Sequence, residues 1–166
     1  MIYIIGYMGV GKSTIGEILS KEINIPFIDT DNYIENITGK NISEIFNNHG
    51  EIYFRELEKK VISEIKGNKI VACGGGLPIN NIEYINKNGS SIYLQASNKF
   101  LYNRLKEIKE NRPLIKSKNN EELRDYIKKQ MLVREHIYAK AKYIINIENK
   151  NKLDILREIN TLITFI

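Results

Sequence analysis

The chain has 166 residues, of which 42% are hydrophobic and 27% charged, with a formal net charge of +5. These proportions are typical of a globular domain, and no apolar run approaches the length of a membrane-spanning helix. The lysines are spread along the sequence, which favours an ordinary basic surface over a nucleic-acid interface. We therefore expect one domain covering residues 1–166, with neither a membrane nor a nucleic acid as its partner.

Cys73 is the only cysteine, so no disulfide can form within the chain, as is usual in a reducing compartment. No signal-peptide pattern precedes the first apolar run, which favours the cytoplasm. No coiled-coil pattern or long apolar surface helix calls for a second copy, so we also expect a monomer.

Short apolar runs rich in β-branched residues alternate with longer segments of helical periodicity. The runs predicted as strands are Ile2–Ile5, Pro26–Ile28, Ile70–Cys73, Ile92–Gln95 and Tyr143–Ile147. The segments predicted as helices are Lys12–Ile23, Ile42–Asn48, Ile52–Ile65, Asn80–Asn86, Asn98–Ile108, Glu121–Tyr138 and Lys152–Ile163. Ser97 and Asn120 are expected at helix N-termini. This alternation predicts a three-layer α/β/α fold around a five-stranded parallel sheet.

Directly after the first predicted strand, residues 6–13 read Gly-Tyr-Met-Gly-Val-Gly-Lys-Ser, which fits the phosphate-loop pattern G-x-x-x-x-G-K-[ST]. The glycines allow a tight turn whose N–H groups converge on phosphate oxygens, above the positive end of the following helix. Lys12 would reach the β- and γ-phosphates, and the Ser13 hydroxyl would face Mg²⁺. An ordinary glycine turn would explain neither residue, so the loop predicts nucleotide binding.

Two carboxylates, Asp29 and Asp31, follow the second predicted strand. Open parallel sheets bind ligands at the carboxyl ends of their strands, so both are expected near the phosphates. One could hold Mg²⁺, directly or through water, and the other could accept a hydrogen bond, and the proton, from an acceptor hydroxyl. A helix N-cap or turn aspartate is the alternative interpretation.

The run Gly74-Gly75-Gly76 follows the third predicted strand, at the same edge of the sheet. Three glycines cost backbone entropy when they become ordered. They therefore favour close approach of the backbone to a ligand, with N–H groups free to bond it, over a merely flexible turn. Cys73, just before the run, is expected to be a small buried residue and not a nucleophile.

Two arginines lie on predicted helices. Arg55 alone is typical of a solvated arginine paired with Glu58 three residues later, and Arg134 alone suits the end of a helix. Together they could grip an anionic substrate, because the planar guanidinium binds a carboxylate or phosphate through two hydrogen bonds.

The least regular stretch is Lys109–Asn119, which contains Arg112-Pro113-Leu114. It is either a plain connecting loop or a mobile lid that closes over the phosphates.

These motifs, in this order, resemble those of the shikimate kinases, a phosphate-loop family related to the nucleoside monophosphate kinases. The resemblance covers nearly the whole chain and rests on Gly6–Thr14, Asp29-Thr30-Asp31, Ile45-Phe46, Gly50-Glu51, Phe54-Arg55, Gly74-Gly75-Gly76, Arg112-Pro113-Leu114, and Arg134 with Tyr138. It implies transfer of the γ-phosphoryl group of ATP to the 3-hydroxyl of shikimate, with Mg²⁺ as cofactor.

The resemblance also implies roles for individual residues. ATP would be bound by Gly9, Val10, Gly11, Lys12, Ser13, Thr14, Arg112 and Lys150. Shikimate would be bound by Asp31, Arg55, Gly75 and Arg134, with Phe46 and Phe54 lining the ring's pocket. The catalytic residues would be Lys12, Asp31 and Arg112, and the metal site would use Ser13 and, through water, Asp29. The lid would lie at about 109–119, and substrate-binding helices at about 32–65.

Two positions depart from the family pattern. The basic residue near adenine has only an uncertain match, Lys150, in the segment before the last predicted helix. The proline often found after the second arginine is replaced by Glu135-His136, which puts the local helix geometry in question.

Two other functions fit part of the pattern. One is another small-molecule kinase, acting on gluconate or a nucleoside monophosphate, although no pocket for a second base is identifiable. The other is a catalytically silent nucleotide-binding module. The presence of Lys12, Ser13, Asp29, Asp31 and Arg112 argues against lost catalysis.

Overall fold

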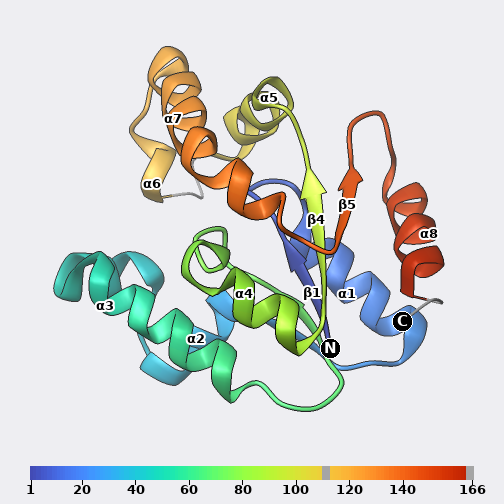
Figure 1. The fold of residues 1–166 in the computed structure, drawn as a ribbon. Coiled ribbons are helices and arrows are strands. Elements are labelled where there is room, and N and C mark those ends of the chain that lie inside the picture. Colours follow the sequence, from blue (N-terminus) through green and yellow to red (C-terminus); the bar gives the residue numbers. More distant parts are fainter. Residues whose placement is uncertain (110–112, 164–166) are drawn as a thin grey trace.

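A parallel β-sheet forms the centre of the computed structural model, which describes residues 1–109 and 113–163 (Figure 1). Within that part of the chain the sheet has five strands in the order β2-β3-β1-β4-β5. Their bounds are β1 Ile2–Ile5, β2 Phe27–Asp29, β3 Ile70–Ala72, β4 Ser90–Gln95 and β5 Tyr143–Asn146. The described helices are α1 Lys12–Ile23, α2 Thr30–Thr38, α3 Ile42–Glu64, α4 Pro78–Asn88, α5 Asn98–Ile108, α6 Pro113–Lys116, α7 Asn120–Tyr138 and α8 Lys152–Ile163.

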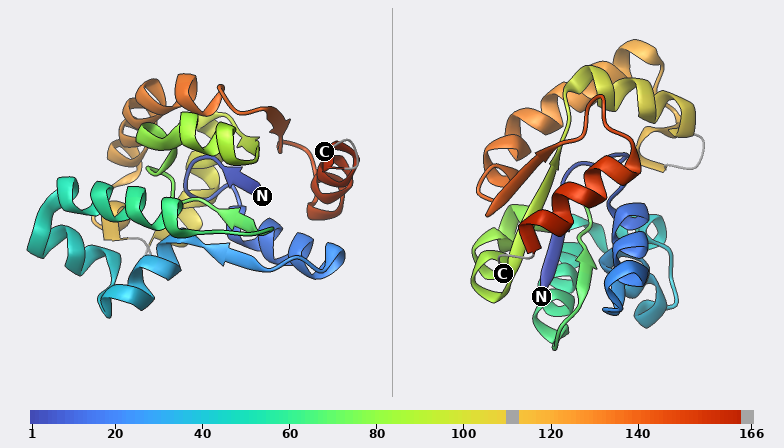
Figure 2. Two further views of the ribbon diagram at one scale, coloured as in Figure 1. Left: turned by 60° about the horizontal axis from the view of Figure 1, so that its bottom comes forward. Right: turned by 90° about the vertical axis from the view of Figure 1, so that its right-hand side faces the viewer.

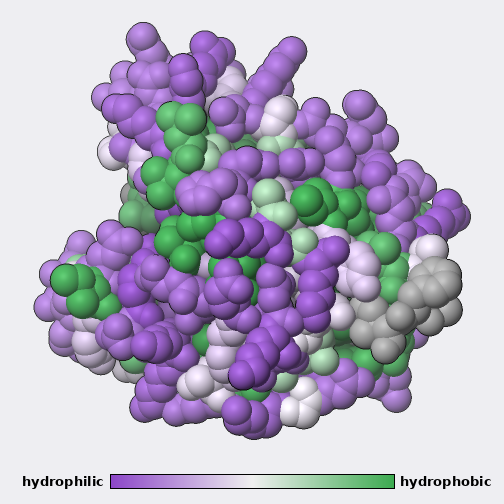
Figure 3. Space-filling model, in the orientation of Figure 1, coloured by the Kyte–Doolittle hydropathy of each residue, from purple (hydrophilic) through white to green (hydrophobic). Residues whose placement is uncertain are grey.

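The helices cover both faces of the sheet. α1 lies on one face with α8 against it, and α4 lies on the other, in contact with α3 and α7 (Figure 2). The predicted α/β/α architecture is therefore confirmed. None of the described helices is both long and apolar enough to cross a bilayer. The face seen in Figure 3 is mostly hydrophilic, with small, separate hydrophobic patches.

The central strand β1 sets the register of the sheet. Ile2 is paired with Ile70 of β3 on one side and with Ser90 of β4 on the other. All four residues of β1 are buried. This is expected of a parallel strand covered on both faces, and it explains why β1 reads as an unbroken apolar run. The carboxyl ends of β1, β2 and β3 consequently lie side by side.

The predicted elements agree with the structure, with a few differences. The bounds of α1, α5 and α8 are confirmed, and the Ser97 side chain caps α5 by accepting a hydrogen bond from Phe100 N. The cap of α7 is Asn119 and not Asn120, because its side chain accepts from the N–H groups of residues 121 and 122. A one-turn helix, α6, lies in the stretch predicted as irregular.

The two helices predicted over 42–48 and 52–65 are joined across a kink in the structure, and neither α2 nor the one-turn α6 was predicted as a separate helix. α3 runs from Ile42 to Glu64 and bends at Gly50, whose φ of 79° and ψ of 176° are not helical. α2 begins immediately after β2, where Asp29 caps it. Its sequence is short and mostly polar, and the capping carboxylate of Asp29 was one signal of its start.

Candidate active site

The phosphate loop occupies the turn between β1 and α1. Gly6, Gly9 and Gly11 all have positive φ, with values of 141°, 85° and 95°, which favours glycine at each position. Gly11 is the N-cap residue of α1, and the side chain of Val10 is buried in the core. Only the backbone of Val10 is therefore available to a ligand. The Lys12 ammonium donates a hydrogen bond to the Tyr7 carbonyl at 2.9 Å.

Asp29 links the end of β2 to the phosphate loop. Its Oδ2 accepts a hydrogen bond from the Ser13 hydroxyl at 2.5 Å, and its Oδ1 accepts from the N–H groups of Asp31 and Asn32. The N-cap interpretation of this aspartate is therefore confirmed, while its other oxygen faces the phosphate loop and stays available to the predicted metal role. The pair offers a carboxylate and a hydroxyl oxygen, the ligand type that Mg²⁺ prefers.

The glycine run faces three charged side chains. A Cβ atom on Gly74 would collide with the Asp31 carboxylate, and one on Gly76 would collide with the Arg55 guanidinium. In both cases the distance would be below 3.0 Å, which Cβ atoms in real structures essentially never show. At Gly75 the neighbouring atom is an Arg134 nitrogen, at an ordinary 3.6 Å. None of the three glycines has positive φ. Side chains at Gly74 and Gly76 would therefore displace Asp31 and Arg55, a reason for glycine at these two positions that the sequence did not reveal.

Arg55 is held by two carboxylates on its own helix. Its guanidinium donates to Glu58 at 2.6 Å and to Glu51 at 2.8 Å. The predicted pairing with Glu58 is present, but the expectation of a solvated pair is wrong, because the Glu58 side chain is only 1% exposed. Glu58 lies on the face of α3 that also buries Val61 and Ile62, which takes the pair out of water.

Glu58 is a site residue that the sequence analysis missed. Burial raises its pKa to about 7, although Arg55 and, more weakly, Arg134 pull it down, while Asp31 adds to the rise. Arg55, Asp31 and Arg134 all influence the pKa of Glu58, so these three charged groups lie close to it. A carboxylate among the apolar positions of a helix was the only signal available in the sequence.

Arg134 projects from the last turns of α7. Its guanidinium lies over the Tyr7 ring, with Cζ 5.5 Å from the ring centroid, and is close enough to Tyr138 to lower the pKa of that hydroxyl. Tyr138 in turn donates from its hydroxyl to the Gly75 carbonyl at 2.5 Å. Burial raises the pKa of Tyr138 to about 12, with Arg134 opposing the rise. The second predicted arginine is thus tied to the glycine run.

The Glu135-His136 replacement leaves α7 helical through Tyr138. The Glu135 carboxylate accepts hydrogen bonds from the Tyr93 hydroxyl at 2.6 Å and from the Gln95 amide at 2.9 Å, both on β4. These bonds fix the last turns of α7 against the sheet without a proline.

The predicted aromatic lining lies on α3, on either side of its kink. The rings of Phe46 and Phe54 are 4.7 Å apart between centroids, and Arg55 lies over Phe54 at 5.6 Å. Cys73 is buried and without a disulfide, as expected, and burial raises the pKa of its thiol.

The other residues that the sequence analysis expected at the ATP site are Lys150 and Arg112. Lys150 forms an ion pair with Glu158 of α8 at 2.6 Å. Arg104 of α5, which the sequence analysis did not name, lies beside the phosphate loop. One of its guanidinium nitrogens is 3.6 Å from where a Cβ of Gly11 would lie. No motif in the sequence marked Arg104, because only the fold brings α5 beside the phosphate loop. Arg112 lies outside the described residues.

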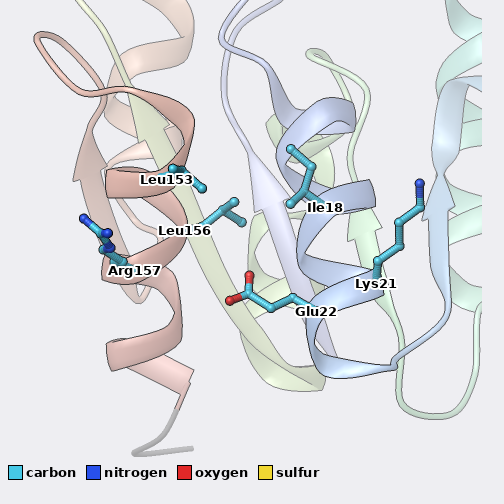
Figure 4. Close-up of a pocket in the computed structure, with 6 residues that line it drawn as sticks. All are labelled: Ile18, Lys21, Glu22, Leu153, Leu156 and Arg157. Carbon is cyan, nitrogen blue, oxygen red and sulfur yellow. The ribbon is translucent and has the colours of Figure 1, made fainter.

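Two surface hollows lie away from these residues. One, of about 450 Å³, lies between α1 and α8 and is lined by Ile18, Lys21, Glu22, Leu153, Leu156 and Arg157 (Figure 4). The other, of about 700 Å³, lies where β4, β5 and α7 meet and includes Gln95, Met131 and Glu135 in its lining. Neither is lined by a residue that the sequence assigned to a site.

Comparisons with known proteins identify the family of the chain. A sequence model of the family described as shikimate kinase matches residues 8–164. A shikimate kinase of Bacteroides fragilis is 40% identical over 86% of this chain and 82% of its own. One of Flavobacterium psychrophilum is 39% identical over 98% of both chains.

Solved structures agree as well. The crystal structure of shikimate kinase from Bacteroides thetaiotaomicron has a TM-score of 0.92, with 34% identity over 98% of this chain and 97% of that one. The shikimate kinase from Acinetobacter baumannii in complex with shikimate has a TM-score of 0.87, with 31% identity over 98% of this chain and 92% of that one. The chain therefore belongs to the shikimate kinase family.

Proposed function

We propose that this protein transfers the γ-phosphoryl group of ATP to the 3-hydroxyl of shikimate. The observation that carries the proposal is the convergence of Asp31, Arg134 and Arg55 on three successive glycines beside the phosphate loop. Two guanidinium groups suit the carboxylate of shikimate, and one carboxylate suits its hydroxyls. The same arrangement offers less to a nucleoside monophosphate, because no second base site accompanies it among the described residues. Gluconate also carries a carboxylate and hydroxyls, so the acceptor assay below has to separate it from shikimate.

The phosphate side of the site supports the transfer step. The backbone of Gly9–Thr14 would surround the ATP phosphates, and Lys12 would leave the Tyr7 carbonyl to stabilise the transferring group. Arg112 would add a second positive charge from a lid at about 109–119, and Arg104 or Lys150 would contact the adenosine part. These assignments of individual residues are proposals.

The acceptor side positions the hydroxyl. Asp31 would accept the hydrogen bond of the 3-hydroxyl and take its proton as the new phosphate ester forms. Arg55 and Arg134 would hold the carboxylate at the far end of the ring, with the Gly75 backbone, while Phe46 and Phe54 cover its apolar face. The acceptor oxygen would then be oriented by contacts at both ends of the substrate.

Ser13 and Asp29 fit Mg²⁺ but would give it few protein ligands. Among the described residues no group of three or more metal-ligating side chains exists. Ser13 and Asp29 supply the two oxygens that an ion bound chiefly by phosphates and water needs. When bound, the ion would neutralise charge on the phosphates of ATP.

We also propose that residues 1–166 form one kinase domain, with substrate-binding helices over about 32–65, and that the protein is a cytoplasmic monomer. α2 and α3 supply Asp31, Arg55 and Glu58, which supports the assignment of those helices. Small, separate hydrophobic patches on the face seen in Figure 3 support a monomer.

The test is ADP release from MgATP with shikimate as acceptor, beside gluconate and AMP, for the native chain and for Arg134→Ala. We expect turnover with shikimate only, and its collapse in the variant. Turnover with another acceptor would keep the kinase and discard the substrate. No turnover with any acceptor would favour a silent nucleotide-binding module.

A further inference from the structure

We infer that Tyr7, a phosphate-loop residue, positions Arg134 for the carboxylate of the acceptor through the face of its ring. The inference rests on the proposed function, because it concerns the same acceptor site. Tyr7 belongs to the part of the chain that would bind ATP, whereas Arg134 belongs to the part that would bind shikimate.

The contact between the two side chains is direct. The Arg134 guanidinium carbon lies 5.5 Å from the centroid of the Tyr7 ring, within the range of a cation–π interaction. Tyr7 is only 1% exposed, so the ring is shielded from water, and such interactions strengthen when they are desolvated. An arginine has many rotamers, and a fixed ring face removes most of them before the substrate arrives.

A second tyrosine limits the guanidinium as well. Arg134 is close enough to lower the pKa of Tyr138, and the Tyr138 hydroxyl donates a hydrogen bond to the Gly75 carbonyl. The guanidinium therefore lies over the ring face of Tyr7, near Tyr138, with a nitrogen 3.6 Å from where a Cβ of Gly75 would be. Its position is set by three different segments, β1–α1, β3–α4 and α7, which only the folded chain brings together.

The ring of Tyr7, and not its hydroxyl, carries this role. Among the described residues the Tyr7 hydroxyl has no hydrogen-bond partner, although it is buried. An unpaired buried hydroxyl costs stability and contributes no directed contact. The groups that influence it are Tyr126, Arg134 and Tyr138, which come from α7. Replacing Tyr7 by Phe should therefore preserve its function, and removing the ring should not.

The backbone of Tyr7 allows the two half-sites to be separated by experiment. Its carbonyl accepts the hydrogen bond of the Lys12 ammonium, and any side chain leaves that carbonyl in place. Loss of the ring should therefore affect the acceptor and leave ATP binding largely unchanged.

Steady-state kinetics of Tyr7→Leu, Tyr7→Phe and Tyr102→Leu test the inference. In the control pair, Arg124 lies over the Tyr102 ring at 4.4 Å, between α5 and α7 and away from the glycine run. We expect Tyr7→Leu to raise the KM for shikimate roughly tenfold, the loss of one desolvated cation–π contact, with kcat and the KM for ATP nearly unchanged. Tyr7→Phe and Tyr102→Leu should keep the native KM for shikimate.

Two further variants keep the test decisive. In an Arg134→Ala background, Tyr7→Leu should raise the KM no further, because the ring acts through that arginine. Tyr7→Met provides a second variant without a ring in case Tyr7→Leu does not fold, as judged by thermal melting and MgADP binding.

The outcomes separate the two claims. Native turnover of shikimate with an unchanged KM in the ringless variants overturns the inference alone. An equal loss in Tyr7→Phe, or an equal rise in the KM for ATP, also overturns it, because the effect would then belong to the hydroxyl or to the loop. Absence of shikimate turnover in the native chain overturns the proposed function, and the inference with it.

Discussion

At the scale of single residues, the site depends on three glycines whose lack of side chains leaves room for charged neighbours. The three glycines after β3 leave room for Asp31, Arg134 and Arg55, and each faces a different one of them. Glycine runs are often explained by backbone freedom, but none of these three glycines has positive φ, and at Gly74 and Gly76 the lack of space for a Cβ atom explains the residue. Alanine should therefore affect activity to different degrees at these three adjacent positions.

Alanine at Gly74 or Gly76 should lower kcat/KM for shikimate at least about tenfold, because the new methyl group displaces Asp31 or Arg55. Alanine at Gly75 should have a smaller effect, since its Cβ would meet Arg134 at a normal contact distance of 3.6 Å and its N–H remains. Kinetics with varied shikimate at saturating MgATP measure all three. A larger loss at Gly75 than at its neighbours would contradict the steric explanation.

The buried carboxylate of Glu58 makes stability depend on pH. Folding raises its pKa from 4.5 to about 7, so between these values the native state keeps a proton that the unfolded chain has released. Stability should therefore fall as the pH rises from about 4.5 to about 7 and then level off, by up to about 3 kcal/mol. Urea unfolding across this range measures the slope.

Glu58→Gln should flatten that part of the curve, because the amide does not titrate. Glu64→Gln provides the matched control, since Glu64 lies on the same helix, is 49% exposed and has only a 3.9 Å contact with Lys60. A curve for Glu58→Gln as steep as that of the native chain would show that other groups dominate the dependence.

At the scale of elements, α3 owes its shape to one residue. Gly50 has φ 79° and ψ 176°, a region that is essentially restricted to glycine. No atom lies within 4 Å of a Cβ built there, so strain and not collision would oppose a side chain. The kink lies between Phe46 and Phe54, whose rings meet at 4.7 Å. It therefore brings the two halves of the aromatic lining together.

Gly50→Ala should destabilise the protein by about 2 kcal/mol and raise the KM for shikimate, because either the backbone is strained or α3 straightens. Gly39→Ala is the control, since Gly39 has φ 64° at the end of α2, also with open space, and lies outside the aromatic pair. It should cost about 1 kcal/mol with little effect on KM. Unfolding and kinetics on the same preparations distinguish strain alone from a change in the site.

The sequence predicted most elements because their signals are local. The apolar run of β1, the phosphate loop and the bounds of α1, α5 and α8 depend on residues close together in the chain. The predicted break between helices over 42–48 and 52–65 falls at the kink at Gly50, because glycine is the residue that most easily adopts its φ of 79°. Arg104 was missed because its place beside the phosphate loop depends on packing between distant elements. Glu58 was named only as the partner of Arg55, because its burial depends on packing that no spacing in the sequence encodes.

At the scale of the whole molecule, the elements proposed to bind the nucleotide differ from those proposed to bind the acceptor. The phosphate loop and α1 follow β1, whereas the residues proposed to bind the acceptor come from α2, α3, the β3–α4 turn and α7. The carboxyl ends of neighbouring strands place both sets along one edge, the usual position of ligands in open α/β sheets. Because Arg134 comes from α7 and the loop from β1, the two substrates should stabilise the fold through largely separate contacts.

Ligand-induced stabilisation tests that division. Shikimate at about one hundred times its Kd should stabilise the native chain by about 2.7 kcal/mol, a rise in Tm of about 5–10 °C for a chain of this size. Arg134→Ala should lose most of that rise while keeping the rise produced by MgADP, since the carboxylate partner is gone and the phosphate loop is intact. Arg124→Ala removes an equivalent charge from α7 at a position stacked on Tyr102, and should keep both rises. If Arg134→Ala also lost the response to MgADP, α7 would have to support the nucleotide site directly, and the two half-sites would not be separable by a single residue.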